Sequence, residues 1–505
     1  MDKQTRVIRF ISLFTLVFII CIGGAMVFAP IRPFWLDEWF ILFNLKTKDV
    51  HGLLGELDFT QQFPRAYLVL LKLFTATFNY SYTALRLPAF FIGVLAILLA
   101  WKVMNRIFAP GLFTRYLLVI ILVSSYTFTE YFVEVKQYSM DILLSVFAIW
   151  QLLELLTIQL GARMGGGRYF VLCAGLLIAP FFSYTYPIAF APVFVVVLHY
   201  SLASIRQQSN IQDKLRYLLA QWIPLMLSAL GIVLFYVADV SQLVTDTKMY
   251  AFWGFLILKG DNQVLAFLKG VYVLFAQTGA GIIFETLFGI LGICGFVYGL
   301  ITCVRNYVKK EHSLEHSLKI YTSLVIIFAL VLFALKKLPI GTQRLNSFTT
   351  PSIAVMVIYF INLLAGYIKG NFIKIILPAI LYLGTIGNIF STFFVFFTND
   401  KYKKQMDIYR ATQSVIELAQ GQKIPILVSN GVAYPYYYNA PQGSDLPDPA
   451  VWILKVFPAY DFKMSIPVYA IKDINNADEI NTVLPKEYLR CYVGDGTNFK
   501  LYIRH

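Results

Sequence analysis

The stretch FISLFTLVFIICIGGAMVFAPIRPFWLDEWF, residues 10–40, decides the fold class of this chain. Residues 10–29 are apolar, and this run matches the ~20 residues that a helix needs to cross the hydrocarbon core of a bilayer. The run is long and lacks a closing small-residue cleavage site, so a retained membrane helix fits better than a cleaved signal peptide. Asp37 and Glu38 follow directly, and carboxylates beside a membrane span require an explanation.

The composition of the whole chain also indicates a membrane protein. Of 505 residues, 58% are hydrophobic and only 14% are charged, and the mean hydropathy is +0.67, which excludes an ordinary soluble domain. The net charge of +14 comes from Lys and Arg at the ends of apolar runs, where lipid headgroups favour them, so nucleic-acid binding is not expected. Lys3, Arg6 and Arg9 precede the first run and predict a cytoplasmic N-terminus.

The apolar runs predict a polytopic α-helical membrane protein with about eleven transmembrane helices. The predicted spans cover residues 10–29, 84–106, 112–130, 140–160, 169–183, 187–204, 217–239, 286–304, 319–336, 346–367 and 374–398. The uncharged stretch between Arg168 and Arg206 is too long for one helix, and Pro180 and Pro187 divide it into two short helices joined by a tight turn. With this count the basic clusters between spans fall on one side of the membrane.

Two further apolar segments, 66–78 and 249–267, are short or interrupted by charge at Lys72 and Lys259. We expect both to form helices that lie in the outer membrane interface rather than spans. If the second segment, extended to Phe284, crossed the membrane, the C-terminus would be cytoplasmic.

The composition changes after Thr398, which predicts two domains: a transmembrane domain over residues 1–398 and a soluble domain over 399–505. Short strand-like runs at 424–428, 466–471 and 500–503 predict a small α/β fold for the second domain. An odd number of spans places this domain on the external, periplasmic side.

Cysteine and histidine spacing offers no redox or metal motif. Four of the five cysteines lie within apolar runs, and Cys491 stands alone near the C-terminus. His312 and His316 have helical spacing but lie in the charged stretch 309–316, where a solvated loop is favoured over a zinc site. No cofactor is predicted from these residues, and a requirement for a divalent metal ion stays open.

Carboxylates and cations gather on the external face of this topology. Asp37 and Glu38 share that face with Glu134 of the segment 130–141. Basic residues there run against the positive-inside bias and are natural phosphate ligands. They are Arg65, Arg86, Lys136, Lys337 and Arg344. One carboxylate that takes a proton from a hydroxyl nucleophile, with cations that hold a phosphate leaving group, would suit a lipid-linked substrate.

The same residues have other interpretations. Asp37 and Glu38 could equally cap an interfacial helix, because acidic side chains are favoured at helix starts. Glu134 and Lys136 could form a surface ion pair. The external cations could bind membrane lipid headgroups. From the residues alone these alternatives stay open.

Four motifs follow one another along the chain. They are Trp35-Leu36-Asp37-Glu38, Ala84-Leu85-Arg86-Leu87-Pro88, Glu134-Val135-Lys136-Gln137-Tyr138-Ser139-Met140-Asp141 and Gly341-Thr342-Gln343-Arg344-Leu345. In this order, and over most of its length, the chain resembles the GT-C superfamily of glycosyltransferases. The branch that it resembles holds protein O-mannosyltransferases, the lipid A aminoarabinose transferase and lipopolysaccharide core galacturonosyltransferases. Each motif is weak singly, whereas their order is fairly specific.

The resemblance implies a polyprenyl-phosphate-linked sugar donor, inversion at the anomeric carbon and a catalytic aspartate that maps onto Asp37. Glu38 would then tune or position this base, and Arg344 would contact the donor phosphate. By the same resemblance, the residues that line the cavity would be Glu134, Lys136 and Tyr138. Lys136 stands where many relatives carry Arg, and Lys offers a point charge rather than a bidentate fork.

The sequence thus predicts a glycosyltransferase of the bacterial inner membrane that acts on a lipid, glycan or protein hydroxyl at the external face. A transporter or lipid flippase is the rival class, but its charges should cluster in mid-span, whereas here they lie mostly at span ends and in loops. A polysaccharide polymerase or ligase, which would use a pyrophosphate-linked glycan, is a third possibility.

Overall fold

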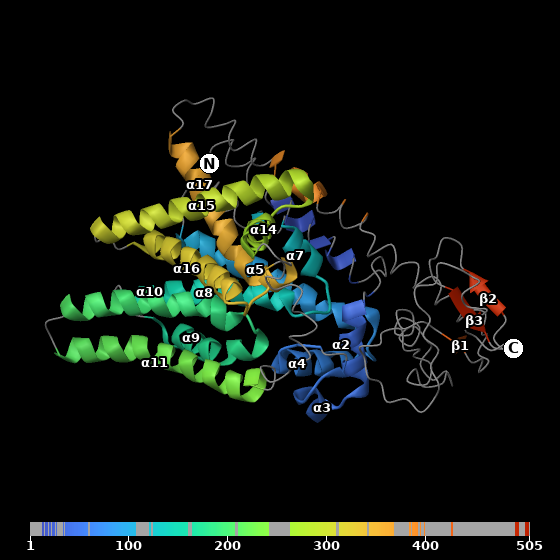
Figure 1. Cartoon of the computed structure of the whole chain (residues 1–505). Coiled ribbons are helices and arrows are strands. Elements are labelled where there is room, and N and C mark those ends of the chain that lie inside the picture. Colours follow the sequence, from blue (N-terminus) through green and yellow to red (C-terminus); the bar gives the residue numbers. More distant parts are fainter. Residues whose placement is uncertain are drawn as a thin grey trace. The chain divides into compact units, whose positions relative to one another are not determined.

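The computed structural model describes most of the helical part of the chain and short pieces of the C-terminal part (Figure 1). The described residues are 34, 36–58, 61–107, 121–122, 125–159, 164–207, 211–241, 263–309, 313–340, 343–367, 383–384, 386–391, 394, 398, 426–427, 490–493 and 500–503, with short runs between 13 and 27. The chain divides into two compact units. We call Met1–Phe28 with Gln62–Val395 the helical unit, and Ala29–Gln61 with Phe396–His505 the second unit.

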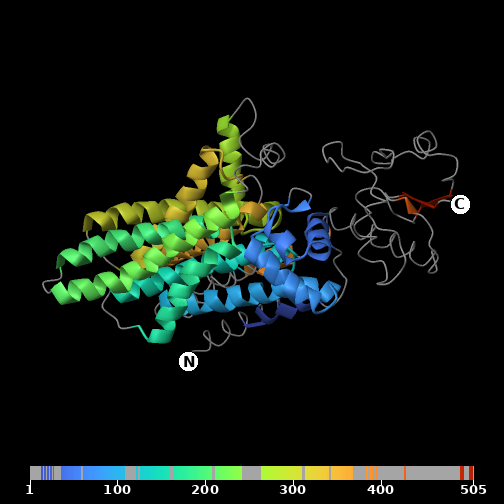
Figure 2. The same cartoon turned by 90° about the horizontal axis from the view of Figure 1, so that it is seen from below.

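The centre of the helical unit is α8 (Tyr138–Gln159), an almost wholly buried helix. It packs against α5 (Tyr82–Ile107) and α10 (Tyr186–Gln207), and α10 packs in turn against α16 (Leu314–Ala334). In Figure 1 and Figure 2, α10 in green and α16 in yellow run along the same direction of the bundle. A helix that is apolar on nearly all sides, as α8 is, is expected at the centre of a bundle.

The outer helices of this unit form two further packed groups, in which α9 lies on α11, and α15 lies on both α14 and α17. Their bounds are α9 (Gly166–Ile178), α11 (Ile211–Phe235), α14 (Gln263–Ala276), α15 (Gly281–Lys309) and α17 (Thr350–Tyr367). Large apolar side chains stand exposed on α9, α11, α14 and α15, for example Met226 at 66% and Ile282 at 84% exposure, whereas α17 is mostly buried. Such rows suit the hydrocarbon core of a bilayer rather than water.

Five short elements lie where the long helices begin or end, and among them are those that carry Arg65, Tyr131, Asp239 and Arg344. They are α4 (Arg65–Ala76), α7 (Tyr126–Tyr131), the 3-10 turns η2 (Ala179–Phe182) and η5 (Gln343–Thr349), and the π-helical turn η3 (Tyr236–Val240). The α4 helix and the end of α11 both pack on η2, and α7, α8 and α14 pack on η5.

Six helices of the described chain are long and apolar enough to cross a membrane. They begin at Tyr82, Tyr138, Trp222, Gly281, Leu314 and Arg344. Each coincides with a predicted span, and the protein is therefore a multi-pass membrane protein, as its composition predicts. The predicted pair of short helices is also confirmed, because α9 with η2 ends at Phe182 and α10 starts at Tyr186. The full count of about eleven spans stays a prediction.

Three boundaries differ from the prediction or lie outside the described residues. The predicted span 112–130 does not continue to residue 130, because the Ser125 hydroxyl accepts the Phe128 N–H and starts a separate helix, α7. The predicted interfacial helix 249–267 is described only at its end, where α14 runs from Gln263 to Ala276, and residues 249–262 lie outside the described part. The other predicted interfacial helix, 66–78, is confirmed as a helix by α4.

The second unit holds α2 (Leu36–Thr47) and α3 (Val50–Leu54). The Asn44 amide closes this segment, since its oxygen accepts the Asp58 N–H at 2.8 Å and its nitrogen donates to the Asp58 carbonyl at 3.3 Å. Three strands are described further on, β1 (Ile426–Leu427), β2 (Arg490–Val493) and β3 (Lys500–Ile503), in the antiparallel order β1-β3-β2.

Two of the three predicted strand runs therefore coincide with strands, at 426–427 and 500–503. The third run, 466–471, lies outside the described residues. The α/β character of this domain and its boundary at residue 399 stay predictions.

Candidate active site

The loop between α7 and α8, residues 132–137, is held from inside the bundle. Arg86 of α5 is fully buried, and its Nη1 donates a hydrogen bond to the Val133 carbonyl at 2.9 Å. The Arg86 guanidinium also lies over the Tyr82 ring, 4.9 Å from its centroid. The loop backbone bends tightly, with the Lys136 N–H 2.7 Å from the Glu134 carbonyl. Arg86 thus fixes the segment that presents Glu134 and Lys136.

Tyr131 is a shared neighbour of several predicted site residues. Its ring packs against that of Tyr138 in a tilted arrangement, with 4.6 Å between centroids and 54° between the ring planes. Burial raises the pKa of Tyr131 well above its ordinary value, and the charges of Glu130 and Glu134 add to this, whereas Arg344 acts in the opposite direction. Electrostatic action of this kind requires proximity, so the structure gathers Glu134, Tyr138 and Arg344 around one phenol.

Arg344 reaches this cluster because of the turn that carries it. The η5 turn packs against both α7 and α8, and it leads directly into α17. Arg344 is half-buried near the start of the turn, while Glu134 and Lys136 are buried. The positive charges of Arg344 and Lys136 favour an anionic ligand, and burial strengthens such an interaction.

Two other predicted phosphate ligands lie elsewhere in the helical unit. Arg65 is the first residue of α4 and is buried, with its Nε 3.9 Å from Asp239 Oδ1. Lys337 lies in the exposed turn after α16, next to Lys336 at φ 58°. The function of Arg65 and Lys337 in phosphate binding stays a prediction.

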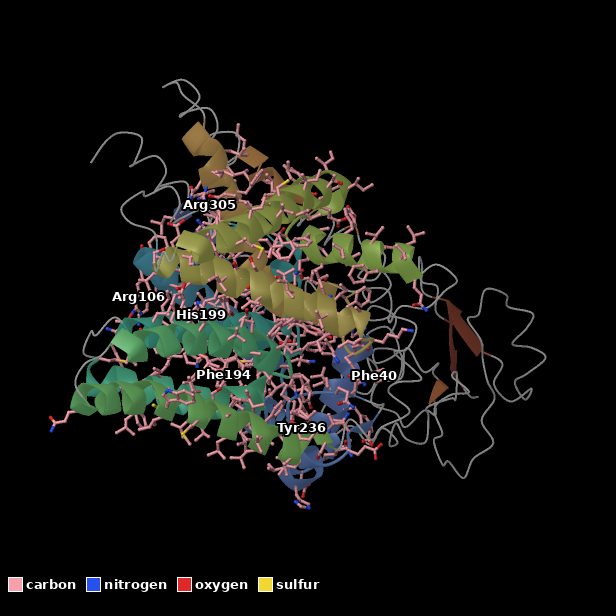
Figure 3. The ribbon with its side chains drawn as sticks, turned by 60° about the vertical axis from the view of Figure 1, so that its left-hand side comes forward. Phe40, Arg106, Phe194, His199, Tyr236 and Arg305 are labelled. Carbon is pink, nitrogen blue, oxygen red and sulfur yellow. The ribbon has the colours of Figure 1, made fainter. Side chains whose placement is uncertain are left out.

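The opposite end of the bundle has a different arrangement. Glu154, 16 residues after Tyr138 in α8 and so roughly 24 Å along the helix axis, pairs with Arg106 and Arg168, each at 2.7 Å. Figure 3 shows Arg106 and Arg305 at one end of the helical unit and Tyr236 of η3 at the other. The candidate site therefore lies at the end away from this arginine cluster.

Sequence reasoning missed two buried carboxylates near the candidate site. Asp141 accepts a hydrogen bond from the Ser183 hydroxyl, and Asp239 accepts one from the Tyr184 hydroxyl at 2.9 Å. In the sequence, Asp141 is the last residue of the motif 134–141, and Ser183 and Tyr184 lie in the turn between Pro180 and Pro187. A signal was present for both, because acidic residues inside apolar runs are costly and usually functional.

Asp37 and Glu38, the carboxylates that follow the first apolar run, belong to the second unit. Asp37 and Glu38 both lie in the first turn of α2, with Asp37 half-buried and Glu38 buried. Negative charge there interacts favourably with the helix dipole, which agrees with the interpretation of these residues as the start of a helix. The catalytic role of Asp37 and its approach to Glu134 and Arg344 stay predictions.

In the part of the chain that the structure describes, no group of three or more His, Cys, Asp or Glu side chains is arranged to hold a metal ion.

Comparison with known proteins identifies the fold. No protein-family model matches the chain, and no curated protein sequence does. Two crystal structures of ArnT from Cupriavidus metallidurans match over 97% of both chains at 12% identity, one bound to undecaprenyl phosphate with a TM-score of 0.54 and one in the apo state with 0.53.

The archaeal oligosaccharyltransferase AglB from Archaeoglobus fulgidus, in complex with an inhibitory peptide and a dolichol-phosphate, also matches. It does so at 13% identity over 91% of this chain and 62% of its own, with a TM-score of 0.45. The match to ArnT covers nearly all of both chains. The chain therefore has the fold of ArnT.

Proposed function

We propose that this protein is an inverting glycosyltransferase that moves one sugar from a polyprenyl-phosphate carrier to a hydroxyl group of a surface glycolipid, glycan or protein. The observation that carries the proposal is the fold shared with ArnT over 97% of both chains, because one of the ArnT crystal structures is bound to undecaprenyl phosphate. The group of Glu134, Tyr138 and Arg344 around Tyr131 supports it.

The chemistry required of the site is the stabilisation of a phosphate leaving group and the removal of a proton from the acceptor. Arg344 and Lys136 supply positive charge for the phosphate, and their burial strengthens each interaction with it. In this proposal Asp37 takes the proton from the acceptor hydroxyl, and Glu38 positions it. Inversion follows when the hydroxyl attacks the anomeric carbon from the face opposite the phosphate.

The proposed membrane orientation places the site on the external face. The exposed or half-buried arginines at the other end of the bundle, Arg106, Arg168 and Arg305, support a cytoplasmic position for that end. The C-terminal domain, residues 399–505, is then external, and the protein acts in the bacterial inner membrane on donors presented at its outer leaflet.

The test is transfer of radiolabelled sugar from a panel of polyprenyl-phosphate sugars in membranes that contain the wild type or Asp37→Asn. We expect transfer by the wild type and its loss in the variant at equal protein level. Asp49→Asn is a matched control, because Asp49 lies in the same segment and caps α3, where Asn serves as well as Asp. Retained transfer by Asp37→Asn would remove the assigned base, and no transfer by the wild type would remove the proposed function.

A further inference from the structure

Asp239 is a buried carboxylate in the π-helical turn η3 at the end of α11, and it is 5% exposed. Its Oδ2 accepts the backbone N–H of Arg65 at 3.0 Å, and its Oδ1 accepts the Tyr184 hydroxyl at 2.9 Å. A carboxylate in a membrane protein is costly to bury, and π-helical turns are frequent at functional sites. This residue therefore needs an explanation beyond ordinary packing.

The contact with Arg65 makes Asp239 the cap of α4. The residue before α4 is Pro64, which makes no side-chain capping bond, and Arg65 is the first residue of the helix. The first amides of a helix lack partners within the helix and carry partial positive charge. Asp239, 174 residues away in the sequence, supplies both the acceptor and the negative charge.

Tyr184 extends this contact to the residue that precedes Pro64. Its hydroxyl lies 3.0 Å from the Phe63 carbonyl, to which Arg65 Nη1 also donates at 3.3 Å. Burial raises the pKa of Tyr184 well above its ordinary value, and the negative charge of Asp239 adds to this, so the hydroxyl keeps the proton that it donates. Residues 63–65 are thus held by two distant segments.

The turn that carries Tyr184 also connects this contact to the start of α8. Ser183 is extended, with φ −155° and ψ 126°, so neighbouring side chains point to opposite sides. The Ser183 hydroxyl donates to Asp141 of α8, while the Tyr184 hydroxyl donates to Asp239 of η3. One turn therefore links α4 to the helix that begins with Tyr138.

Residues 63–65 have a special place in the chain, because they follow directly on the segment 29–61 of the second unit. The N-terminal end of that segment lies two residues after Val27. The Val27 carbonyl accepts the Thr83 hydroxyl at 3.3 Å. Asp37 lies between these two attachments. Any loosening at residues 63–65 lengthens the tether and widens the range of positions open to Asp37.

We propose that Asp239 is a positioning residue for sugar transfer: by capping α4 it fixes the end of the segment that carries Asp37. The inference rests on the proposed function in so far as Asp37 is the base. A group that acts through the position of the base changes kcat, whereas donor binding through Arg344 is left intact.

The experiment compares Asp239→Asn with Glu154→Gln in the purified full-length protein. Glu154 is an equally buried carboxylate that pairs with arginines, but at the other end of α8. Both oxygens of Asp239 accept a hydrogen bond, whereas Asp49 caps α3 with one, so Asn at 239 must lose an acceptor that Asn at 49 does not. For Asp239→Asn we expect kcat to fall about tenfold with the donor KM within about twofold of wild type, since small misplacements of reacting groups cost this much. Amide hydrogen exchange over residues 36–67 should rise about tenfold, while α10 exchanges as in the wild type.

Tyr184→Phe removes one partner of Asp239 and should give a smaller change in the same direction. Glu154→Gln should leave both kcat and the exchange of residues 36–67 unchanged, even where it lowers the melting temperature. The inference is overturned if Asp239→Asn has the same kcat and the same exchange of residues 36–67 as the wild type. It is also overturned if Asp239→Asn raises the donor KM and leaves kcat unchanged. If the wild type transfers no sugar the proposed function fails separately, and the exchange of residues 36–67 still decides whether Asp239 anchors α4.

Discussion

Arg86 of α5 and Val133 of the loop before α8 are joined by a hydrogen bond of 2.9 Å from a fully buried guanidinium to a backbone carbonyl. The arginine that the sequence suggests as a phosphate ligand is thereby engaged with the loop that carries Glu134 and Lys136. Positive charge at Arg86 contributes to the electrostatics of the region, while its hydrogen bond determines where the loop lies.

Replacement of Arg86 by Leu should lower the free energy of unfolding by about 2 kcal/mol, because it leaves the buried Val133 carbonyl without this donor. Thermal unfolding of the purified protein in detergent measures the change, and sugar transfer should fall as the loop shifts. Arg305→Leu is the control, since Arg305 is exposed at the other end of the bundle. Equal stability of the two variants would contradict the assigned role of Arg86.

Arg344→Ala should raise the donor KM about tenfold or more, because a half-buried arginine beside Tyr131 is the proposed phosphate ligand. Initial rates at several donor concentrations measure the effect. Arg344→Lys keeps the charge but loses the bidentate geometry, so an intermediate KM is expected. An unchanged donor KM in Arg344→Ala would show that the phosphate is bound elsewhere.

The sequence predicted the long helices well, because length and hydropathy alone define a helix that crosses a bilayer. It was less successful where a polar cap interrupts an apolar run. Ser125 lies within the predicted span 112–130 and caps the start of a separate helix, α7.

For the candidate site, sequence motifs identified Glu134, Tyr138 and Arg344, which the structure gathers around Tyr131. They could not identify the Asp239 and Tyr184 contact, because those residues lie far apart in the chain and belong to no common motif. Contacts of this kind depend on how α11 and the turn before α10 pack, and one sequence does not encode that in a local pattern.

The pKa of Tyr131 predicts how stability responds to alkaline pH. Burial and the charges of Glu130 and Glu134 raise this pKa, so the folded protein keeps the phenol proton at pH values where the unfolded chain, with a tyrosine pKa of about 10, has lost it. Above pH ~10 the folded state then binds more protons than the unfolded state, and stability falls as the pH rises. Below that value Tyr131 contributes no pH dependence.

Between about pH 10 and about pH 11, an ordinary tyrosine loses its proton. In this range the melting temperature of Tyr131→Phe should therefore fall less steeply with pH than that of the wild type. Between pH ~6 and ~9 the two proteins should respond to pH in parallel. Parallel curves above pH ~10 as well would mean that Tyr131 titrates in the fold as it does in the unfolded chain.

Close approach of α15 to α17 predicts opposite effects for two glycines of the same helix. A Cβ atom at Gly295 would overlap the carbonyl oxygen of Met356 in α17, so the helices would have to separate. A Cβ atom at Gly289 would meet its nearest neighbour, Ala276, at 3.6 Å, an ordinary contact. Gly295→Ala should thus destabilise the protein by about 1–3 kcal/mol, as overpacking does in other cores.

Gly289→Ala should instead be neutral or stabilise the protein by up to about 1 kcal/mol, because alanine favours the helix. The melting temperatures of both variants are measured in the same detergent. Because both substitutions replace Gly by Ala within α15, the gain in helix propensity is the same and the difference between them reports on packing. Small residues at helix interfaces in membranes allow backbones to approach closely, and this contact is an instance. Equal melting temperatures of Gly295→Ala and Gly289→Ala would contradict the close contact between Gly295 of α15 and Met356 of α17.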